Sequence, residues 1–228
     1  KDVLNVLGEL PERFLTPIGD DCAGLVASTA TNSRHKHGDA VFGTAEGCLH
    51  FFVRARANSL HLVHKPIAVS AQAACTLPAV WCTVHEALRR ACACGHRVLL
   101  LHAAAGGIGL AGIEYARWLG VVVVASAGSP GKHALLSSLG VSRRGSSRTC
   151  AVFILGMQGL FGSRRVSFVC NALTGDFIPA SNLSLGEAGN FQDIGKRGAW
   201  SLQRAICATS NVLDVIDLVT DVRQSSRW

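Results

Sequence analysis

The chain has 228 residues, of which 49% are hydrophobic and 24 are glycine, and its formal net charge is +7. This length and composition predict a globular protein of one or two domains and exclude an intrinsically disordered chain. No apolar run approaches the roughly 18 residues that a transmembrane helix needs, and the first residues lack the charged start and long apolar centre of a signal peptide.

We therefore expect a soluble, intracellular protein, and the sequence does not distinguish the cytoplasm from a plastid or a mitochondrion. The nine cysteines contain no Cys-x-x-Cys pair and stand mostly in apolar surroundings, which favours free thiols over a disulfide scaffold.

The positive charge is concentrated in one segment. From Tyr115 to Gly175 the chain has no Asp or Glu but seven Lys or Arg residues, so the whole net charge arises there. Such a segment attracts a polyanion, either a cofactor with an extra phosphate or an acidic carrier protein, although a solvated basic surface is the alternative. Nucleic acid is disfavoured because no aromatic side chains interleave with the basic ones.

The first third of the chain reads as short strands and turns. Expected strands are Cys22–Ala27, Ala40–Phe42, Phe51–Val53 and Leu60–Val63. These predict a small, partly closed β-barrel. After Ser70 the apolar residues recur with the spacing of a helix. We place the domain boundary near Leu77 and Pro78, which divides the chain into residues 1–77 and 78–228.

The remainder alternates between strands and helices. Expected strands are Val98–Leu101, Val121–Ala125, Val166–Asn171 and Asn190–Ile194, and expected helices follow Pro78 and cover Ile108–Leu119, Lys132–Leu139, Ala151–Phe161 and Phe177–Leu183. The alternation predicts an α/β fold with a Rossmann-type parallel sheet and helices on both faces.

A phosphate-binding turn is expected between the first of these strands and its helix. Ala104-x-Gly106-x-x-Gly109 is the dinucleotide fingerprint with Ala at the first position. Small residues let the backbone approach a pyrophosphate, and the helix start supplies free N–H groups and a positive dipole. The candidate cofactor-binding residues here are Ala104, Gly106, Gly107, Ile108 and Gly109. A bare strand-turn-helix packing unit is the alternative.

The next strand lacks the acid that NAD-selective domains use to hold the ribose hydroxyls. Residues 126–132 instead offer the hydroxyls of Ser126 and Ser129, backbone N–H groups and the Lys132 cation. These groups suit a 2′-phosphate, so NADPH is the predicted cofactor. For Lys132 the alternative is an exposed charge in a helical turn.

Two later strands end in polar residues, Asn171 and Gly195-Lys196, where ligands bind in open α/β sheets. Lys196 is the candidate catalytic residue, donating a proton or orienting a carbonyl, and an exposed lysine is the alternative. Tyr115 and His102 are assigned to packing.

No metal site and no hydrolase are expected. Asp20 and Asp21 lack a nearby histidine, and His35 with His37 reads as a loop. Gly-x-Ser-x-Gly, the nucleophile elbow of α/β-hydrolases, is absent.

The motifs as an ordered set resemble the medium-chain dehydrogenase/reductase superfamily, and most closely the enoyl reductase domain of type I polyketide and fatty acid synthases. The residues that carry this resemblance are Gly19–Gly24, Gly38–Gly43, Thr76–His85, His102–Gly109, Ala127–Lys132 and Ile194–Gly198. It implies a GroES-like domain beside a Rossmann domain with NADPH between them. The implied reaction is hydride transfer to the β-carbon of an α,β-unsaturated acyl thioester on acyl carrier protein, followed by protonation of the α-carbon.

The resemblance also implies residue roles. Gly106, Gly107, Ile108 and Gly109 would hold the pyrophosphate; Ser126, Ser129 and Lys132 the 2′-phosphate region; Thr83, Asn171, Leu173 and Gly195 the nicotinamide side; and Lys196 would donate the proton. Gly19-Asp20-Asp21 replaces the Gly-His-Glu of the zinc-using branch, which implies the metal-free branch.

Both ends of the chain depart from the family. Lys1–Gly8 resembles a segment that normally follows several strands, and Trp200–Trp228 stops before the returning strands of the barrel. We expect the central piece of a reductase, either a fragment of a longer polypeptide or a shortened descendant. The first hypothesis is an enoyl thioester reductase that works with acyl carrier protein or neighbouring synthase domains. The alternatives are a non-catalytic subunit bound to other subunits of a larger assembly, and a free-standing quinone or alkenal reductase.

Overall fold

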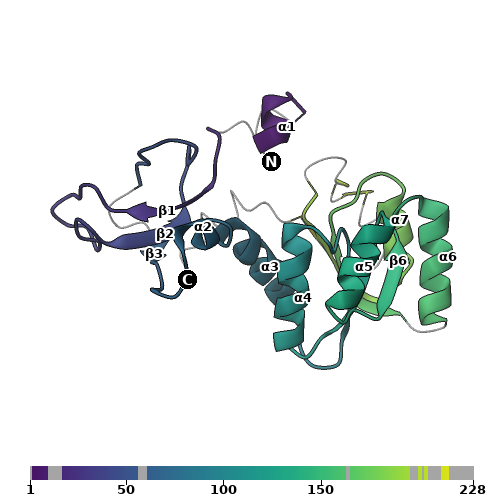
Figure 1. The fold of residues 1–228 in the computed structure, drawn as a ribbon. Helices are drawn as coiled ribbons and strands as arrows, with labels where there is room; N and C mark the ends of the chain where they lie inside the picture. The colour runs from purple at the N-terminus through teal and green to yellow at the C-terminus, as the bar shows by residue number, and fades with distance from the viewer. Residues whose placement is uncertain are drawn as a thin grey trace. The chain divides into compact units, whose positions relative to one another are not determined.

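The structure is a computed structural model that describes residues 2–9, 17–55, 61–162, 165–195, 200–201 and 203–204, and the backbone of residues 212–215 (Figure 1). Two compact units meet in the sequence between Cys82 and Thr83. This division lies inside the helix α3 (Pro78–Arg90), whose first residue is where the sequence analysis places the domain boundary.

The first unit contains a small antiparallel sheet in the order β1-β2-β3. Its strands are β1 (Asp21–Leu25), β2 (Ala40–Thr44) and β3 (Leu62–His64), accompanied by the short helices α1 (Asp2–Val6) and α2 (Ala71–Ala74). Gly43 allows β2 and β3 to approach closely, because a Cβ at this position would lie 1.8 Å from the His61 carbonyl oxygen. The sheet is that of a partial GroES-like domain, as the sequence predicts.

One expected strand is wrong. Residues 51–53 form a bend rather than a strand, and the side chains of Phe51 and Phe52 are exposed. Both edges of β2 are already occupied, by β1 and by β3. In the described part of this sheet residues 51–53 pair with none of the three strands, so the apolar run alone was not enough to predict a strand.

The second unit is built on a six-stranded sheet in the order β6-β5-β4-β7-β8-β9, with every neighbouring pair parallel. The strands are β4 (Val98–Leu101), β5 (Val122–Ala127), β6 (Arg143–Ser146), β7 (Val166–Asn171), β8 (Leu185–Asp193) and β9 (Val212–Val215). The helices besides α3 are α4 (Gly107–Trp118), α5 (Pro130–Ser138), α6 (Cys150–Phe161) and α7 (Phe177–Asn182).

Both faces of this sheet are covered. Leu99, Leu100 and Leu101 follow one another in β4 and none is more than 1% exposed. Successive side chains of a strand point to opposite faces, so burial of all three requires a cover on each side. Phe153 of α6 and Ile178 of α7 belong to the same buried cluster as Leu100. The predicted α/β fold with a parallel, doubly covered sheet is confirmed.

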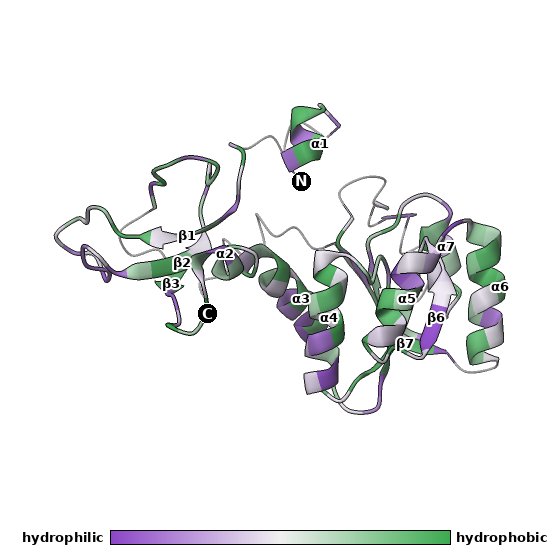
Figure 2. Ribbon diagram, viewed as in Figure 1, coloured by the Kyte–Doolittle hydropathy of each residue, from purple (hydrophilic) through white to green (hydrophobic). Residues whose placement is uncertain are grey.

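The sequence analysis missed β6, which reads Arg-Arg-Gly-Ser. Figure 2 shows this strand as hydrophilic beside the hydrophobic α6. In the described part of the chain β6 is an edge strand of the sheet and pairs with β5 alone, with Arg143 opposite Val124. A polar edge strand has no alternating or continuous apolar pattern by which it could be recognised.

Candidate cofactor and active site

The turn between β4 and α4 presents unpaired backbone donors. Gly106 is the N-cap of α4 with φ −91° and ψ 174°, and it makes no side-chain capping bond. The helical ladder begins where Leu110 N donates to Gly106 O at 2.8 Å. The N–H groups of Gly107, Ile108 and Gly109 precede that bond and have no partner within the helix. With the helix dipole they form a binding site for a phosphate.

The small residues of the fingerprint have distinct roles. A Cβ at Gly109 would lie 2.4 Å from both Cα and C of Ala104, so this glycine lets α4 start directly against the turn. Ala104 is fully buried, and its N–H donates to Ser126 O at 3.1 Å. Gly106 N donates to Ala103 O at 2.8 Å. Ala104 and Gly106 therefore shape the turn, while Gly107, Ile108 and Gly109 present its donors.

The three candidates for the 2′-phosphate region occupy different environments. Ser126 is fully buried and its hydroxyl lies 2.8 Å from His102 Nδ1. Ser129 is half-buried and is the N-cap of α5 without a side-chain capping bond, and Lys132 is exposed in the first turn of that helix. Ser129 and Lys132 thus offer a hydroxyl and a cation at the surface, whereas the hydroxyl of Ser126 is committed to the core.

Arg148 is a further cation at this corner that the sequence analysis did not single out. Its Nη1 lies 3.4 Å from the Gly128 carbonyl oxygen, and Ser147 N donates to Ala127 O at 3.0 Å. The loops after β5 and β6 therefore lie side by side at the carboxyl edge of the sheet. Arg148 belongs to the acid-free segment, which is a signal for it, but only the unpredicted β6 brings it to Gly128.

His102 is part of the core rather than an exposed base. It is 2% exposed, with Nδ1 against Ser126 Oγ and Nε2 2.7 Å from Ser181 Oγ. Burial lowers the pKa of this imidazole to about 3, so it is neutral at physiological pH. Its two hydrogen bonds join the end of β4 to β5 and α7.

A second polar network joins the ends of β7 and β8. Asn171 is fully buried; its Nδ2 donates to Leu173 O at 2.8 Å and to Asp193 Oδ1 at 3.1 Å, and its Oδ1 accepts from Leu173 N at 3.1 Å. Gly195 N also donates to Asp193 Oδ1, at 2.9 Å. Three of the residues assigned to the nicotinamide side, Asn171, Leu173 and Gly195, are thereby held together through Asp193.

Asp193 is a site residue that sequence reasoning missed. It is 2% exposed, and burial raises the pKa of its carboxyl, while the bonds from Gly195 N and Asn171 Nδ2 oppose that rise. The signal for it is its position near the end of the predicted strand Asn190–Ile194; in the structure it is the last residue of β8. Of the other candidates, Thr83 is buried on α3, and Lys196 lies outside the described residues.

Asp21 has a structural role at the start of α3. Its Oδ1 accepts a hydrogen bond from Ala79 N at 2.9 Å, in the first turn of α3. A carboxylate there pairs an N–H that the helix leaves unsatisfied.

A parallel sheet with a glycine turn at the start of α4, together with a small antiparallel GroES-like sheet, defines an oxidoreductase fold of the medium-chain dehydrogenase/reductase type. The crystal structure of CurK enoyl reductase superposes with a TM-score of 0.87 and 30% identity, over 99% of this chain and 71% of that one. A mycobacterial protein solved in complex with NADPH superposes with a TM-score of 0.80 and 25% identity, over 95% of this chain and 69% of that one. The chain belongs to the enoyl reductases of polyketide synthases.

The curated relatives are much longer proteins. A highly reducing polyketide synthase of Emericella nidulans is 31% identical over 208 residues, which is 86% of this chain but 8% of the synthase. No family model matches the chain. Among the described helices, none has the length and apolar character that crossing a membrane requires.

Proposed function

We propose that the chain is an NADPH-dependent enoyl reductase that acts on α,β-unsaturated acyl thioesters in polyketide or fatty acid synthesis. One observation carries this proposal. The start of α4 presents backbone N–H donors, and the region after β5 and β6 that holds Ser129, Lys132 and Arg148, here called the cationic corner, has cations and no carboxylate. Membership of the enoyl reductase family supports the reaction, and the NADPH complex of the mycobacterial relative supports the cofactor.

The described residues suit a dinucleotide with a 2′-phosphate. The N–H groups of Gly107, Ile108 and Gly109 would bind the pyrophosphate, because they have no acceptor within α4 and Gly106 and Gly107 are exposed. Lys132 and Arg148, with Ser129, would bind the 2′-phosphate. In the segment from Ser126 to Arg148 no carboxylate would repel that group.

The substrate side rests on the network around Asp193. This network holds the backbone of Leu173 and Gly195 in place, so their peptide groups can orient the nicotinamide amide and the thioester carbonyl. A reduced nicotinamide supplies the hydride that the β-carbon of the substrate accepts. Lys196 follows Gly195 directly in the sequence and is proposed to protonate the α-carbon.

The domain arrangement and the partner belong to the same proposal. Residues 1–77 would form the partial GroES-like domain and residues 78–228 the dinucleotide-binding domain. The partner would be acyl carrier protein or a neighbouring synthase domain, since the curated relatives are polyketide synthases. The basic segment from Tyr115 to Gly175 suits an acidic carrier protein by charge.

Two measurements on the purified chain and on the full-length protein of its own gene test the proposal. We expect a saturable change in NADPH fluorescence when the protein is added. The Kd for NADPH should be at least about tenfold lower than the Kd for NADH, because NADH lacks the 2′-phosphate and its charge-assisted hydrogen bonds. We also expect oxidation of NADPH by a crotonyl thioester. Absence of nucleotide binding in both proteins would favour the non-catalytic subunit, and turnover with quinones but not thioesters would favour the quinone reductase.

A further inference from the structure

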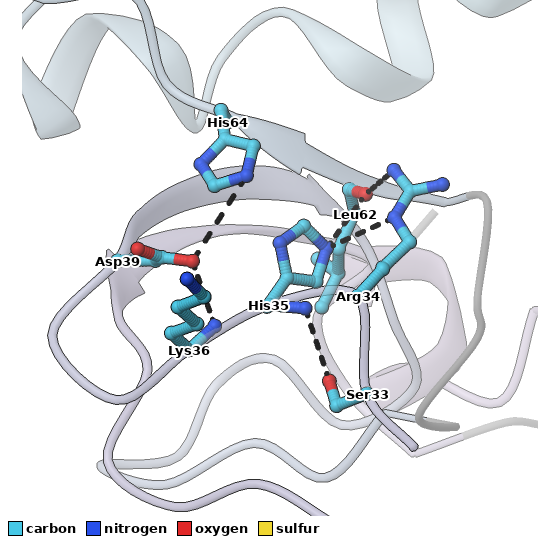
Figure 3. A network of polar contacts seen from close by, with 7 residues as sticks. All are labelled: Ser33, Arg34, His35, Lys36, Asp39, Leu62 and His64. Atoms are coloured by element: carbon cyan, nitrogen blue, oxygen red, sulfur yellow. Dashed lines mark hydrogen bonds and ion pairs between the residues drawn. The ribbon is translucent and has the colours of Figure 1, made fainter.

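Three side chains of metal-ligating type meet in the first unit, whereas the residues assigned to the cofactor all belong to the second unit. His35 lies in the loop before β2, Asp39 directly precedes β2, and His64 ends β3 (Figure 3). One ligand atom from each lies within 4.8 Å of the others. The separation between His64 Nε2 and Asp39 Oδ2 is 3.9 Å.

Strand pairing produces this arrangement. His64 stands opposite Val41 in the antiparallel register of β2 and β3, and Lys65 N donates to Ala40 O at 2.8 Å, so the end of β3 lies beside Asp39. The loop before β2 is closed by a bond from Gly38 N to Val26 O at 2.9 Å. The sequence analysis paired His35 with His37 as a loop, but the sheet pairs His35 with His64 instead.

His35 carries an unsatisfied buried nitrogen. The residue is 7% exposed, and its Nδ1 is buried with no hydrogen-bond partner among the residues that the structure describes. Figure 3 shows the ring with Leu62 and Arg34 on one side and Asp39 and His64 on the other. A buried polar atom without a partner costs about 1–3 kcal/mol, so this nitrogen is a position where a ligand would be stabilising.

The other nitrogen of His35 faces both a hydrogen-bond acceptor and a hydrogen-bond donor. His35 Nε2 lies 3.2 Å from the Leu62 carbonyl oxygen, which can only accept a hydrogen bond. Arg34 Nη2 donates to the same carbonyl at 2.6 Å, and Arg34 Nε donates to His35 Nε2 at 3.3 Å. A metal ion on Nδ1 would select the tautomer with the proton on Nε2, and the Leu62 carbonyl oxygen would then accept a hydrogen bond from that nitrogen in place of the bond from Arg34 Nε. Such a carbonyl partner is what fixes the tautomer of histidines that bind metals.

Asp39 is oriented in a similar way. Its Oδ2 accepts a hydrogen bond from the backbone N–H of Lys36 at 2.7 Å, which orients the carboxylate beside His64. The side chain of His64 is 64% exposed and that of Asp39 is 27% exposed. The site is therefore open to solvent on one side and anchored at the buried His35 on the other.

We propose that His35 Nδ1, Asp39 Oδ2 and His64 Nε2 bind one divalent transition metal ion, of which Zn²⁺ suits the donors best, with water as a fourth ligand. Two imidazoles and one carboxylate favour Zn²⁺ or Co²⁺ over Mg²⁺ or Ca²⁺, which prefer oxygen ligands. Bonds of about 2.0–2.1 Å in a tetrahedron place ligand atoms about 3.4 Å apart. Rotation of the exposed His64 and of Asp39 toward His35 closes the remaining distance.

The consequence of binding is a cross-link between the loop before β2 and the end of β3. The ion stabilises the folded state because the ligands come from segments that lie apart in the unfolded chain. This inference does not rest on the proposed reductase activity, so either one can fail without the other.

Titration of the metal-free full chain with Co²⁺ tests the proposal, because tetrahedral Co²⁺ absorbs in the visible range. We expect one equivalent to bind, and His64→Gln to weaken binding by about tenfold or more. The matched control is His37→Gln, which removes an exposed histidine two residues from His35 and leaves binding within about twofold. Asp39→Asn is expected to weaken binding as well, while its amide oxygen can still accept the bond from Lys36 N.

Cysteine is the competing ligand in this unit and has its own signature. Burial raises the pKa of the Cys22 thiol to about 12 and raises that of its neighbour Cys48, which disfavours metal-binding thiolates there. Thiolate ligation would show as a near-ultraviolet charge-transfer band of bound Co²⁺ and would survive His64→Gln.

Thermal unfolding gives the second readout. Zn²⁺ is expected to raise the Tm of the wild type and of His37→Gln but not that of His64→Gln, whose metal-free Tm should match the wild type because the side chain is exposed. Equal Co²⁺ affinity of the wild type and His64→Gln, or no stoichiometric binding by the wild type, would overturn the proposal.

Discussion

Asn171 donates a hydrogen bond from Nδ2 to Asp193 Oδ1 at 3.1 Å, and the two residues are register partners at the ends of β7 and β8. The same carboxylate accepts from Gly195 N, so one buried acid holds together the two loops at the carboxyl edge of the sheet. In an open α/β sheet this edge is where ligands bind. The network therefore connects the stability of the sheet to the geometry of the proposed active site.

Asp193→Ala is expected to lower the free energy of unfolding by about 1–3 kcal/mol, because it removes the acceptor of Gly195 N and of one of the two hydrogen bonds that Asn171 Nδ2 donates. Urea unfolding measures this loss. Glu187→Ala is the matched control, since it removes an exposed carboxylate from the same strand and should change stability by less than about 0.5 kcal/mol. Equal losses in the two variants would contradict the role assigned to Asp193.

His102 should make stability depend on pH. Its folded pKa of about 3 is below the ordinary pKa of 6.5 for histidine, so the folded state binds fewer protons than the unfolded state between these values. The contribution is fully present above pH 6.5 and is lost as pH falls toward the folded pKa, with a slope approaching about 1.4 kcal/mol per pH unit.

Unfolding free energies of the wild type and His102→Gln, measured from about pH 7 to pH 4, test this dependence. The difference between the two proteins should shrink as pH falls. His96→Gln, which removes an exposed histidine, should retain the wild-type slope. A pH-independent difference between wild type and His102→Gln would show that His102 is not buried in neutral form.

Gly109→Ala should disrupt the phosphate turn. The added Cβ would lie 2.4 Å from the backbone of Ala104, so the start of α4 must move, at a cost of about 1–3 kcal/mol. NADPH binding should weaken in parallel because the same N–H groups are displaced. Gly159→Ala in α6 is the control: its Cβ meets no atom within 4 Å, and we expect unchanged or higher stability with normal binding. A folded Gly109→Ala protein with wild-type affinity would refute this account.

Lys132→Ala and Arg148→Ala should each weaken NADPH binding by about tenfold while changing NADH binding little, because only NADPH has the 2′-phosphate. Fluorescence titration with both nucleotides measures the ratio. Arg117→Ala removes the same charge from the last turn of α4, at the opposite end from the phosphate turn, and should leave the ratio unchanged. If all three substitutions changed the ratio of NADPH to NADH affinity equally, the cationic corner would act only through nonspecific charge.

The turn from β4 into α4 was predictable because its causes are local. An apolar run, four small residues and a return to helical spacing specify the strand, the turn and the helix within one short stretch of sequence. The same holds for β7 and α7, whose predicted bounds agree with the structure to within a residue. The α/β class follows from this alternation.

The remaining site residues were not predictable because they depend on pairing between distant segments. Arg148 reaches Gly128 because the polar strand β6 pairs with β5. No local sequence pattern predicts β6 or this pairing. Asp193 acquires its role from the register that sets it opposite Asn171.

The sequence by itself determined the strand-turn-helix unit, the concentration of positive charge and the family resemblance, because each depends on residues that are close together in the sequence. Only the tertiary structure decided that the Ser126 hydroxyl is committed to His102, that Asp193 organises the loops, and that His35 meets His64. The physical reason is that burial, strand register and the second partner of a hydrogen bond are properties of two chain segments at once.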